Sequence, residues 1–161
     1  TADHGTKVHN EIEEWIKEGT QPSEIKAING KNWLESYKLK SNIDVFSEVI
    51  IYSTELSIAG TVDILAKNND TGEYELIDWK TSKKIETVSF GNKMGTHEAT
   101  KHIMDCNFYH YSVQLSLYRY ILEEYYNIKI NNQLIAHIRN DGVNALVAPY
   151  MRNEIREMLN S

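Results

Sequence analysis

The most constraining feature of the sequence is a run of three β-type segments joined by short turn-like stretches. Their ranges are 45–52, 58–67 and 74–81, and all three are rich in Ile, Val and aromatic residues. Residues 68–72, between the second and third segments, are a strong turn signal because they combine Asn, Asp and Gly. The pattern predicts three consecutive antiparallel strands within this chain of 161 residues.

The segments on either side follow helical spacing or further strand patterns. Helices are predicted over 5–18, 23–30, 32–40, 108–126 and 152–159, and further strands over 133–139 and 143–147. Residues 82–106 contain scattered polar groups and glycines, which favours a long loop or insertion. This order of helices and strands predicts one domain over residues 1–161, of the α/β (α+β) class, with a central mixed sheet flanked by helices.

Charge is unevenly distributed along the chain. The formal net charge of −6, from 17 Lys and Arg against 23 Asp and Glu, argues at first sight against a nucleic-acid partner. Residues 1–79 hold 7 basic and 15 acidic side chains, a balance of −8, whereas residues 80–161 hold 10 and 8, a balance of +2. Five lysines cluster in the second part: Lys80, Lys83, Lys84, Lys93 and Lys101. The four that follow Lys80 either track a phosphate backbone or are simply solvated.

The composition also limits where the protein can be located and whether it can contain disulfides or cysteine metal sites. No apolar run approaches the roughly 20 residues of a membrane span, and no basic-then-apolar signal segment opens the chain. The single cysteine, Cys106, excludes an internal disulfide and any metal site built from cysteines alone. We therefore expect an intracellular protein, of cytoplasm or nucleus, with no membrane partner.

Three acidic residues fall in register across the predicted strands. If the hairpin is symmetric about residues 68–72, the numbers of opposed residues total 141, as those of Asp63 and Asp78 do. The preceding turn, near residues 54–57, gives a total of about 111, which pairs Glu48 with Asp63. Opposed residues lie about 5 Å apart on one face of a sheet, so three like charges are predicted side by side.

These acids either face solvent or bind a cation. Asp63 and Asp78 each stand between two apolar residues, which indicates a mostly buried sheet where an unpaired charge is costly. Mg²⁺ or Mn²⁺ would compensate the charge, since both take carboxylate oxygens as ligands. Strand alternation places Lys80 on the same face as Asp78. A metal ligand and an ammonium so arranged frame a position where water can attack a phosphodiester.

With these features the sequence resembles the PD-(D/E)xK nuclease superfamily, and in particular its RecB-like exonuclease branch. The matching motifs, in family order, are Gly5-Thr6 with His9, Gly60 to Asp63, Ile77 to Thr81, and Gln114 with Tyr118. The resemblance extends from about residue 4 to residue 120 and implies a restriction-endonuclease-like core of order αβββαβ. Members with an iron–sulfur cluster use four cysteines, so a member without the cluster is implied. Because the chain starts almost at the histidine helix, we expect a domain excised from a longer protein.

The resemblance implies a metal site for Mg²⁺ or Mn²⁺. Asp63, Asp78 and the Trp79 carbonyl would bind the metal, and His9 would complete the site. Glu48 falls where many members carry an acid that holds a metal or its water. A lone histidine in a helix is more often a surface or capping group, but the motif around His9 favours ligation.

The resemblance also implies catalytic and nucleic-acid-binding residues. Lys80 would be the catalytic lysine, acting with Asp63, Asp78 and Glu48. Gln114 and Tyr118, one turn apart on a helix, would contact the nucleic-acid backbone. Lys83 and Lys84 are further candidates for phosphate contacts. The aromatic residues within 108–111 either stack on the bases of a single strand or pack in the core.

We therefore expect a Mg²⁺- or Mn²⁺-dependent deoxyribonuclease, exonucleolytic in mode, that acts in recombination, repair or replication. Its partner would be DNA, as single strands or duplex ends, and a fused or associated helicase and a viral or phage origin are both compatible with this. One alternative is a non-catalytic nucleic-acid-binding or scaffold module, which the intact Asp63, Asp78 and Lys80 argue against. Another is an RNA endonuclease of the viral cap-cleaving type, which the helix of Gln114 and Tyr118 disfavours.

Overall fold

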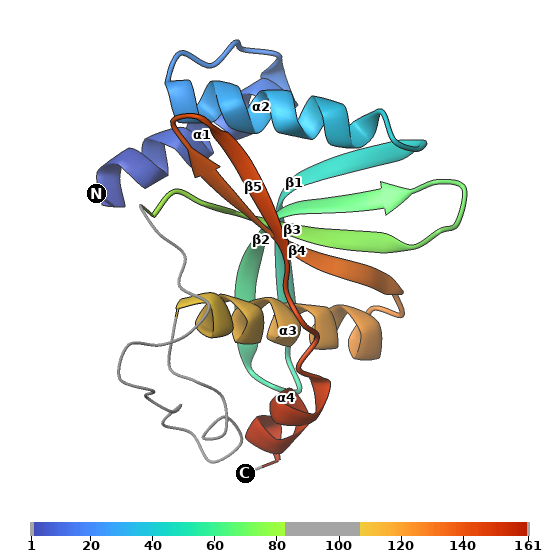
Figure 1. The fold of residues 1–161 in the computed structure, drawn as a ribbon. Coiled ribbons are helices and arrows are strands. Elements are labelled where there is room, and N and C mark those ends of the chain that lie inside the picture. Colours follow the sequence, from blue (N-terminus) through green and yellow to red (C-terminus); the bar gives the residue numbers. More distant parts are fainter. Residues whose placement is uncertain (1, 83–106, 161) are drawn as a thin grey trace.

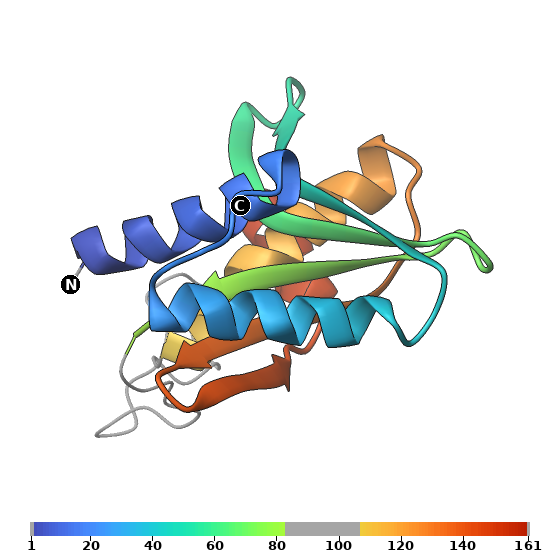
Figure 2. The same cartoon turned by 90° about the horizontal axis from the view of Figure 1, so that it is seen from above.

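The sheet lies between two layers of helices (Figures 1 and 2). A computed structural model of the chain describes residues 2–82 and 107–160. The strands are β1 (Ile43–Ser53), β2 (Ile58–Asn68), β3 (Tyr74–Lys80), β4 (Ile130–Arg139) and β5 (Gly142–Val147). One face is covered by α1 (Ala2–Glu18) and α2 (Ile25–Lys38), and the other by α3 (Asn107–Tyr125), with α4 (Arg152–Leu159) packed beside α3.

The strands lie in the order β1-β2-β3-β4-β5, and the sheet is mixed. All neighbouring pairs are antiparallel except β3 and β4, which are parallel and separated along the chain by α3. A parallel pair needs such a crossover because a tight hairpin can join only antiparallel strands. The mixed α/β class and the helix-flanked mixed sheet are therefore confirmed. The predicted loop or insertion at 82–106 falls, apart from Ser82, outside the described residues.

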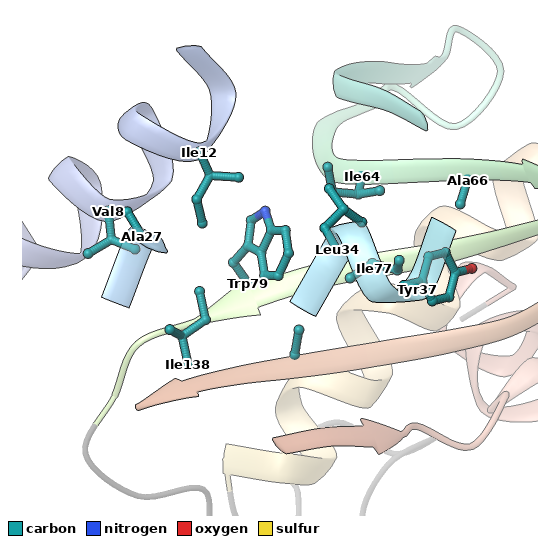
Figure 3. Packing of buried hydrophobic residues seen from close by; sticks show 11 residues of the cluster. Val8, Ile12, Ala27, Leu34, Tyr37, Ile64, Ala66, Ile77, Trp79 and Ile138 are labelled. Atoms are coloured by element: carbon teal, nitrogen blue, oxygen red, sulfur yellow. The ribbon is translucent and has the colours of Figure 1, made fainter. Parts of the chain in front are cut away.

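Two hydrophobic clusters fix the helices to the sheet. The first, which we term the α1–α2 core, has Trp79 of β3 near its centre (Figure 3) and contains Val8, Ile12, Ala27, Leu34, Tyr37, Ile64, Ala66, Ile77, Trp79, Ala136 and Ile138. The second, the α3 core, lies on the opposite face and contains Ile51, Val62, Leu65, Leu76, Leu115, Ile121, Leu122, Ile130, Ile135 and Ala148. Both faces of the sheet are covered at its centre, since consecutive residues are buried in β2 (Ile64, Leu65 and Ala66) and in β3 (Leu76 and Ile77).

The prediction of two short helices at 23–30 and 32–40 is wrong, because α2 is one helix that runs through Gly30. This glycine is buried between neighbouring elements. A Cβ atom on Gly30 would lie 2.7 Å from Ile12 Cδ1 and 3.3 Å from Ile138 Cδ1. The glycine therefore allows α1, α2 and β4 to approach one another, a tertiary role that its local sequence does not distinguish from a helix end.

The start of α2 is fixed by α1 and not by a capping side chain of its own. Glu24 occupies the N-cap position without a side-chain cap hydrogen bond. Instead, the backbone N–H groups of Ser23 and Glu24 donate to Glu11 Oε1 of α1, over 2.7 and 3.0 Å. The bond from Glu24 is the largest of the effects that lower the pKa of Glu11. The carboxylate supplies the acceptor that the first turn of a helix needs.

Candidate active site

Asp63 and Asp78 meet at the end of the β2–β3 hairpin. The hairpin has the predicted register, since Ile64 pairs with Ile77. One step further on, Asp63 Oδ2 accepts a hydrogen bond of 2.9 Å from the backbone N–H of Trp79. Burial raises the pKa of Asp63 well above its usual range, and the charge of Asp78 and a hydrogen bond between the two carboxyls raise it further. The two acids therefore share a site where simultaneous ionisation is costly without a cation.

Glu48 lies opposite Asp63 in the register but outside the β1–β2 ladder. Ser47 pairs with Ile64 and Val49 with Val62, as the predicted register requires, whereas Glu48 makes no pair. Its backbone has a φ of 52°, in the left-handed region that non-glycine residues rarely adopt. Strained backbone of this kind is concentrated at functional sites.

At Glu48 the side chains of the β1–β2 hairpin change the face of the sheet against which they pack. Val45 and Val49, four residues apart on β1, would share one face under strict alternation. In the structure, Val45 packs against the α1–α2 core and Val49 against the α3 core. On β2, Ile64 and Val62 divide in the same way. Figure 1 shows the far half of the hairpin turning away from α1 and α2 and passing α3. Glu48 therefore stands at a bend and not on a regular strand.

Charged residues of α1 influence the pKa of Glu48. Burial and the charge of Glu13 raise the pKa of Glu48, while His9 and Lys17 oppose this. Glu13 itself accepts a hydrogen bond of 2.6 Å from Lys17. The charge of Glu48 also contributes to the raised pKa of Asp63. Glu48 thus interacts electrostatically with Asp63 on one side and with charged residues of α1 on the other.

Lys80 lies beside Asp78, as strand alternation predicts. Its Nζ atom is 3.0 Å from Asp78 Oδ2, and both side chains are largely buried, with exposures of 23% and 16%. Despite this short contact, Asp78 Oδ2 is buried and has no partner of hydrogen-bonding geometry among the described residues. Burial lowers the pKa of Lys80, but Asp78 outweighs this effect and the net pKa is raised. Lys80 is therefore a cation that lies against the Asp78 carboxylate, whose Oδ2 atom can still accept a hydrogen bond.

His9 contacts the third predicted metal ligand. Its Nε2–H group donates to the Trp79 carbonyl oxygen over 3.0 Å. The indole of Trp79 is 3% exposed and meets Trp33 edge to face, with ring centroids 5.7 Å apart. This packing holds the Trp79 peptide in place between the two aspartates and α1. The structure thus brings His9, Trp79, Asp63 and Asp78 to the same end of β3.

The predicted ligand side chains do not form a preassembled metal site. Among residues 2–82 and 107–160, no three His, Cys, Asp or Glu side chains are arranged to hold a metal ion. The candidate ligands are instead engaged with the protein, in the contacts from Asp63 to Trp79 N–H, from His9 to the Trp79 carbonyl and from Lys80 to Asp78. Asp78 Oδ2, whose near neighbour is Lys80 Nζ at 3.0 Å, and the Trp79 carbonyl are nevertheless hard oxygen donors of the type that Mg²⁺ and Mn²⁺ prefer.

Of the two α3 residues predicted to bind nucleic acid, Tyr118 lies against β2 and Gln114 contacts Tyr118. Gln114 Nε2 donates to Tyr118 Oη over 3.4 Å, and Gln114 is exposed. The ring of Tyr118 covers Gly60, since a Cβ atom on Gly60 would lie 2.5 Å from Tyr118 Cε1 and Oη. A similar contact joins two other motifs, because a Cβ atom on Gly5 would lie 2.9 Å from Thr81 Oγ1. The glycines of both motifs therefore permit close approaches.

Tyr111 is a site residue that the sequence analysis did not identify individually. Lys80 Nζ lies 4.3 Å from the centroid of its ring, and the ring also packs against the α3 core. The spacing of Tyr111, Gln114 and Tyr118 along α3 is the signal that could have found it, because residues three and seven apart share a helix face. Lys83 and Lys84, the remaining predicted contacts, lie outside the described residues.

The described part of the chain is thus a mixed α/β protein with a five-stranded sheet flanked by helices. None of its helices has both the length and the apolar character needed to cross a membrane. No model of a known protein family matches the sequence, and no curated protein matches it either.

Proposed function

We propose that this protein is a metal-dependent DNA nuclease of the PD-(D/E)xK type, in its RecB-like branch, with exonucleolytic hydrolysis of phosphodiester bonds as its activity. One observation carries the proposal: Asp63 meets Asp78 and Lys80 at the end of β3, although it precedes them in the sequence by 15 and 17 residues. Acids alone would suggest a solvated patch. An acid pair in which one carboxyl has a raised pKa, next to a partly buried ammonium, is typical of a catalytic site.

The order of elements supports the same class. An antiparallel β1–β2–β3 unit is followed by α3 and by β4, which is parallel to β3. With α1 taken as the first helix, and α2, β5 and α4 as additions, this order is compatible with the αβββαβ core that the proposal requires. The location of His9 on α1 and of Gln114 and Tyr118 on α3 supports this assignment, because the proposed motifs require a histidine on the first helix and the Gln–Tyr pair on the helix after the third strand.

Each residue has a role in this proposal. Asp63, Asp78 and the Trp79 carbonyl would hold Mg²⁺ or Mn²⁺, with Glu48 and His9 adjacent. The bound metal would lower the pKa of a water molecule and neutralise phosphate charge. Lys80 would orient the attacking water or stabilise the charge that develops on the phosphate.

The net charge of −6 is compatible with DNA as the substrate. Part of the acidity of residues 1–79 belongs to Glu48, Asp63 and Asp78, whose charge a metal ion would offset locally. The second part of the chain is positive overall. Affinity for DNA without metal should be modest, because few positive charges are in surplus.

The test is cleavage of end-labelled single-stranded DNA, duplex DNA and RNA, with Mg²⁺, Mn²⁺ or EDTA. Asp78→Ala and Lys80→Ala should each reduce DNA cleavage by at least about a hundredfold. Asp70→Ala, in the exposed β2–β3 turn, and Lys129→Ala, on an exposed lysine, are matched controls and should cut normally. Unchanged cutting by both site variants would sink the proposal. DNA retention without cleavage would indicate a binding module, and preference for RNA an RNA endonuclease.

A further inference from the structure

We propose that Tyr111 is a positioning residue for Lys80, and that the face of its ring holds the Lys80 ammonium beside the aspartate pair. The inference rests on the proposed nuclease function. Two groups of the described residues lie close to Lys80 Nζ, the Tyr111 ring with its centroid at 4.3 Å and Asp78 Oδ2 at 3.0 Å. The first comes from α3 and the second from β3, so the ammonium lies between a helix and the end of a strand.

A lysine in this position needs a second contact. Its ammonium is a point charge on a flexible four-carbon stem, so one ion pair leaves several rotamers open. Asp78 is also a candidate metal ligand, and a carboxylate that serves a metal attracts an ammonium less strongly. The ring of Tyr111 provides attraction that does not depend on Asp78, because the negative face of an aromatic ring attracts cations.

A ring suits this position better than a third acid would. A carboxylate at residue 111 would compete with Asp63 and Asp78 for the metal and would repel the phosphates of DNA. The tyrosine ring has no formal charge and so attracts the ammonium without either effect. It is also anchored, because Tyr111 is half-buried and packs against the α3 core.

The placement on α3 links Lys80 to the predicted DNA-contacting residues. Tyr111 lies three residues before Gln114 and seven before Tyr118, so the three share one face of the helix. Tyr118 on this face covers Gly60 of β2, and Tyr111 reaches Lys80 of β3. One stripe of α3 therefore positions both the catalytic lysine and the residues proposed to meet the DNA backbone.

The first measurement uses the metal-free protein. A lysine side chain over a ring face has its Cε protons shifted upfield by the ring current, so NMR reports the contact directly. We expect an upfield-shifted Lys80 resonance in the wild type and in Tyr111→Phe, and its return to the ordinary position in Tyr111→Leu. The same resonance in Lys80→Ala should be absent, which assigns it.

The second measurement is DNA cleavage with Mg²⁺ or Mn²⁺. Tyr111→Phe keeps the ring face and should retain kcat within about twofold, whereas Tyr111→Leu should lose roughly tenfold in kcat with little change in KM, the size of one cation–π contact. Tyr120→Leu, on another half-buried tyrosine of α3, is the matched control and should retain kcat. Tyr111→Met replaces the leucine variant if that variant does not fold by circular dichroism.

The outcomes separate this inference from the proposed function. A wild-type protein that cuts no DNA refutes both. Normal cutting by the wild type together with unchanged kcat in Tyr111→Leu overturns the positioning role alone. An effect on KM without one on kcat also overturns it, since that result would assign Tyr111 to DNA binding. Equal loss in the Phe and Leu variants would make the hydroxyl, and not the ring, the important group, and would contradict the inference.

Discussion

The ring of Tyr118 lies directly on the backbone of Gly60, so close that a Cβ atom at residue 60 would be 2.5 Å from Tyr118 Cε1 and Oη. Gly60 belongs to β2, three residues before Asp63, and Tyr118 belongs to α3. The contact therefore sets the distance between the helix proposed to meet DNA and the strand that carries Asp63, a proposed metal ligand. The glycine is required here for the close approach and not for a special backbone angle.

Gly60→Ala should displace Tyr118 and lower both stability and DNA cleavage. Overpacking of this kind costs about 1 to 3 kcal/mol in the free energy of unfolding, which urea titration measures. The double variant Gly60→Ala/Tyr118→Ala should lose less stability than the sum of the two single losses, because the clash is absent once the ring is removed. Thr61→Ala, on an exposed neighbour in β2, should be nearly neutral. Equal stability of Gly60→Ala and the wild type would contradict the close contact.

Glu48→Gly should stabilise the fold while it weakens cleavage. The left-handed φ of 52° at Glu48 is unfavourable for glutamate and easy for glycine, so relief of strain should add roughly 1 kcal/mol of stability. Loss of the carboxylate should lower the rate of DNA cleavage. Ser57→Gly is the matched control, since Ser57 has a φ of 54° in the β1–β2 turn. It should gain stability without any change in cleavage. A Glu48→Gly variant with full activity would exclude Glu48 from the site.

Asp63→Asn should make the metal-free protein more stable near pH 7, by roughly 1 to 3 kcal/mol. The unfolded carboxyl loses its proton near pH 4, about the ordinary value, but the folded pKa is higher. Between these two values the folded state binds more protons, so stability of the wild type falls as pH rises through that window. The asparagine side chain of the variant keeps an acceptor for the Trp79 N–H group and cannot ionise.

Thermal unfolding from pH 4 to pH 8 measures this effect. The fall in stability with rising pH should be smaller in Asp63→Asn than in the wild type, and Asp70→Asn in the exposed turn should behave like the wild type. The asparagine variant should also have lost DNA cleavage. An Asp63→Asn protein less stable than the wild type at pH 7 would contradict the raised pKa.

Tyr37→Phe should affect stability alone. The Tyr37 hydroxyl donates to Glu75 Oε1, and Asn132 Nδ2 donates to Glu75 Oε2 over 3.3 Å. Burial, followed by the bond to Glu75, raises the pKa of Tyr37, so the hydroxyl stays protonated as a donor. Its removal should cost about 1 to 2 kcal/mol in urea unfolding, with kcat for DNA cleavage unchanged. Tyr125→Phe, on an exposed tyrosine, should change neither quantity. A change in kcat would mean that this end of the sheet is coupled to the site.

Local patterns predicted the sheet register because the turns at both ends of β2 fix it. The turn at 68–72 and the turn near 54–57 determine which residues face Asp63, and the observed pairs of Ile64 with Ile77 and Val49 with Val62 follow them. The contact between Lys80 and Asp78 could also be predicted from the sequence, because it depends only on strand alternation.

Features that depend on tertiary packing were not accessible from the sequence. The left-handed backbone of Glu48 follows from a bend of the whole hairpin, and Gly30 serves contacts with Ile12 and Ile138 that lie far away in sequence. The contact of Tyr111 with Lys80 joins a helix to a strand residue that precedes it by 31 positions. Only its spacing from Gln114 and Tyr118 indicated a shared face.

The central claim, that Asp63 and Asp78 hold the divalent cation of a nuclease, is tested most directly by anomalous X-ray diffraction from crystals soaked in Mn²⁺. We predict a manganese peak in contact with Asp63, Asp78 and the Trp79 carbonyl, and its loss in Asp78→Ala crystals soaked in the same way. A manganese peak elsewhere on the protein, or none at this site at a Mn²⁺ concentration that supports DNA cleavage, would contradict the account.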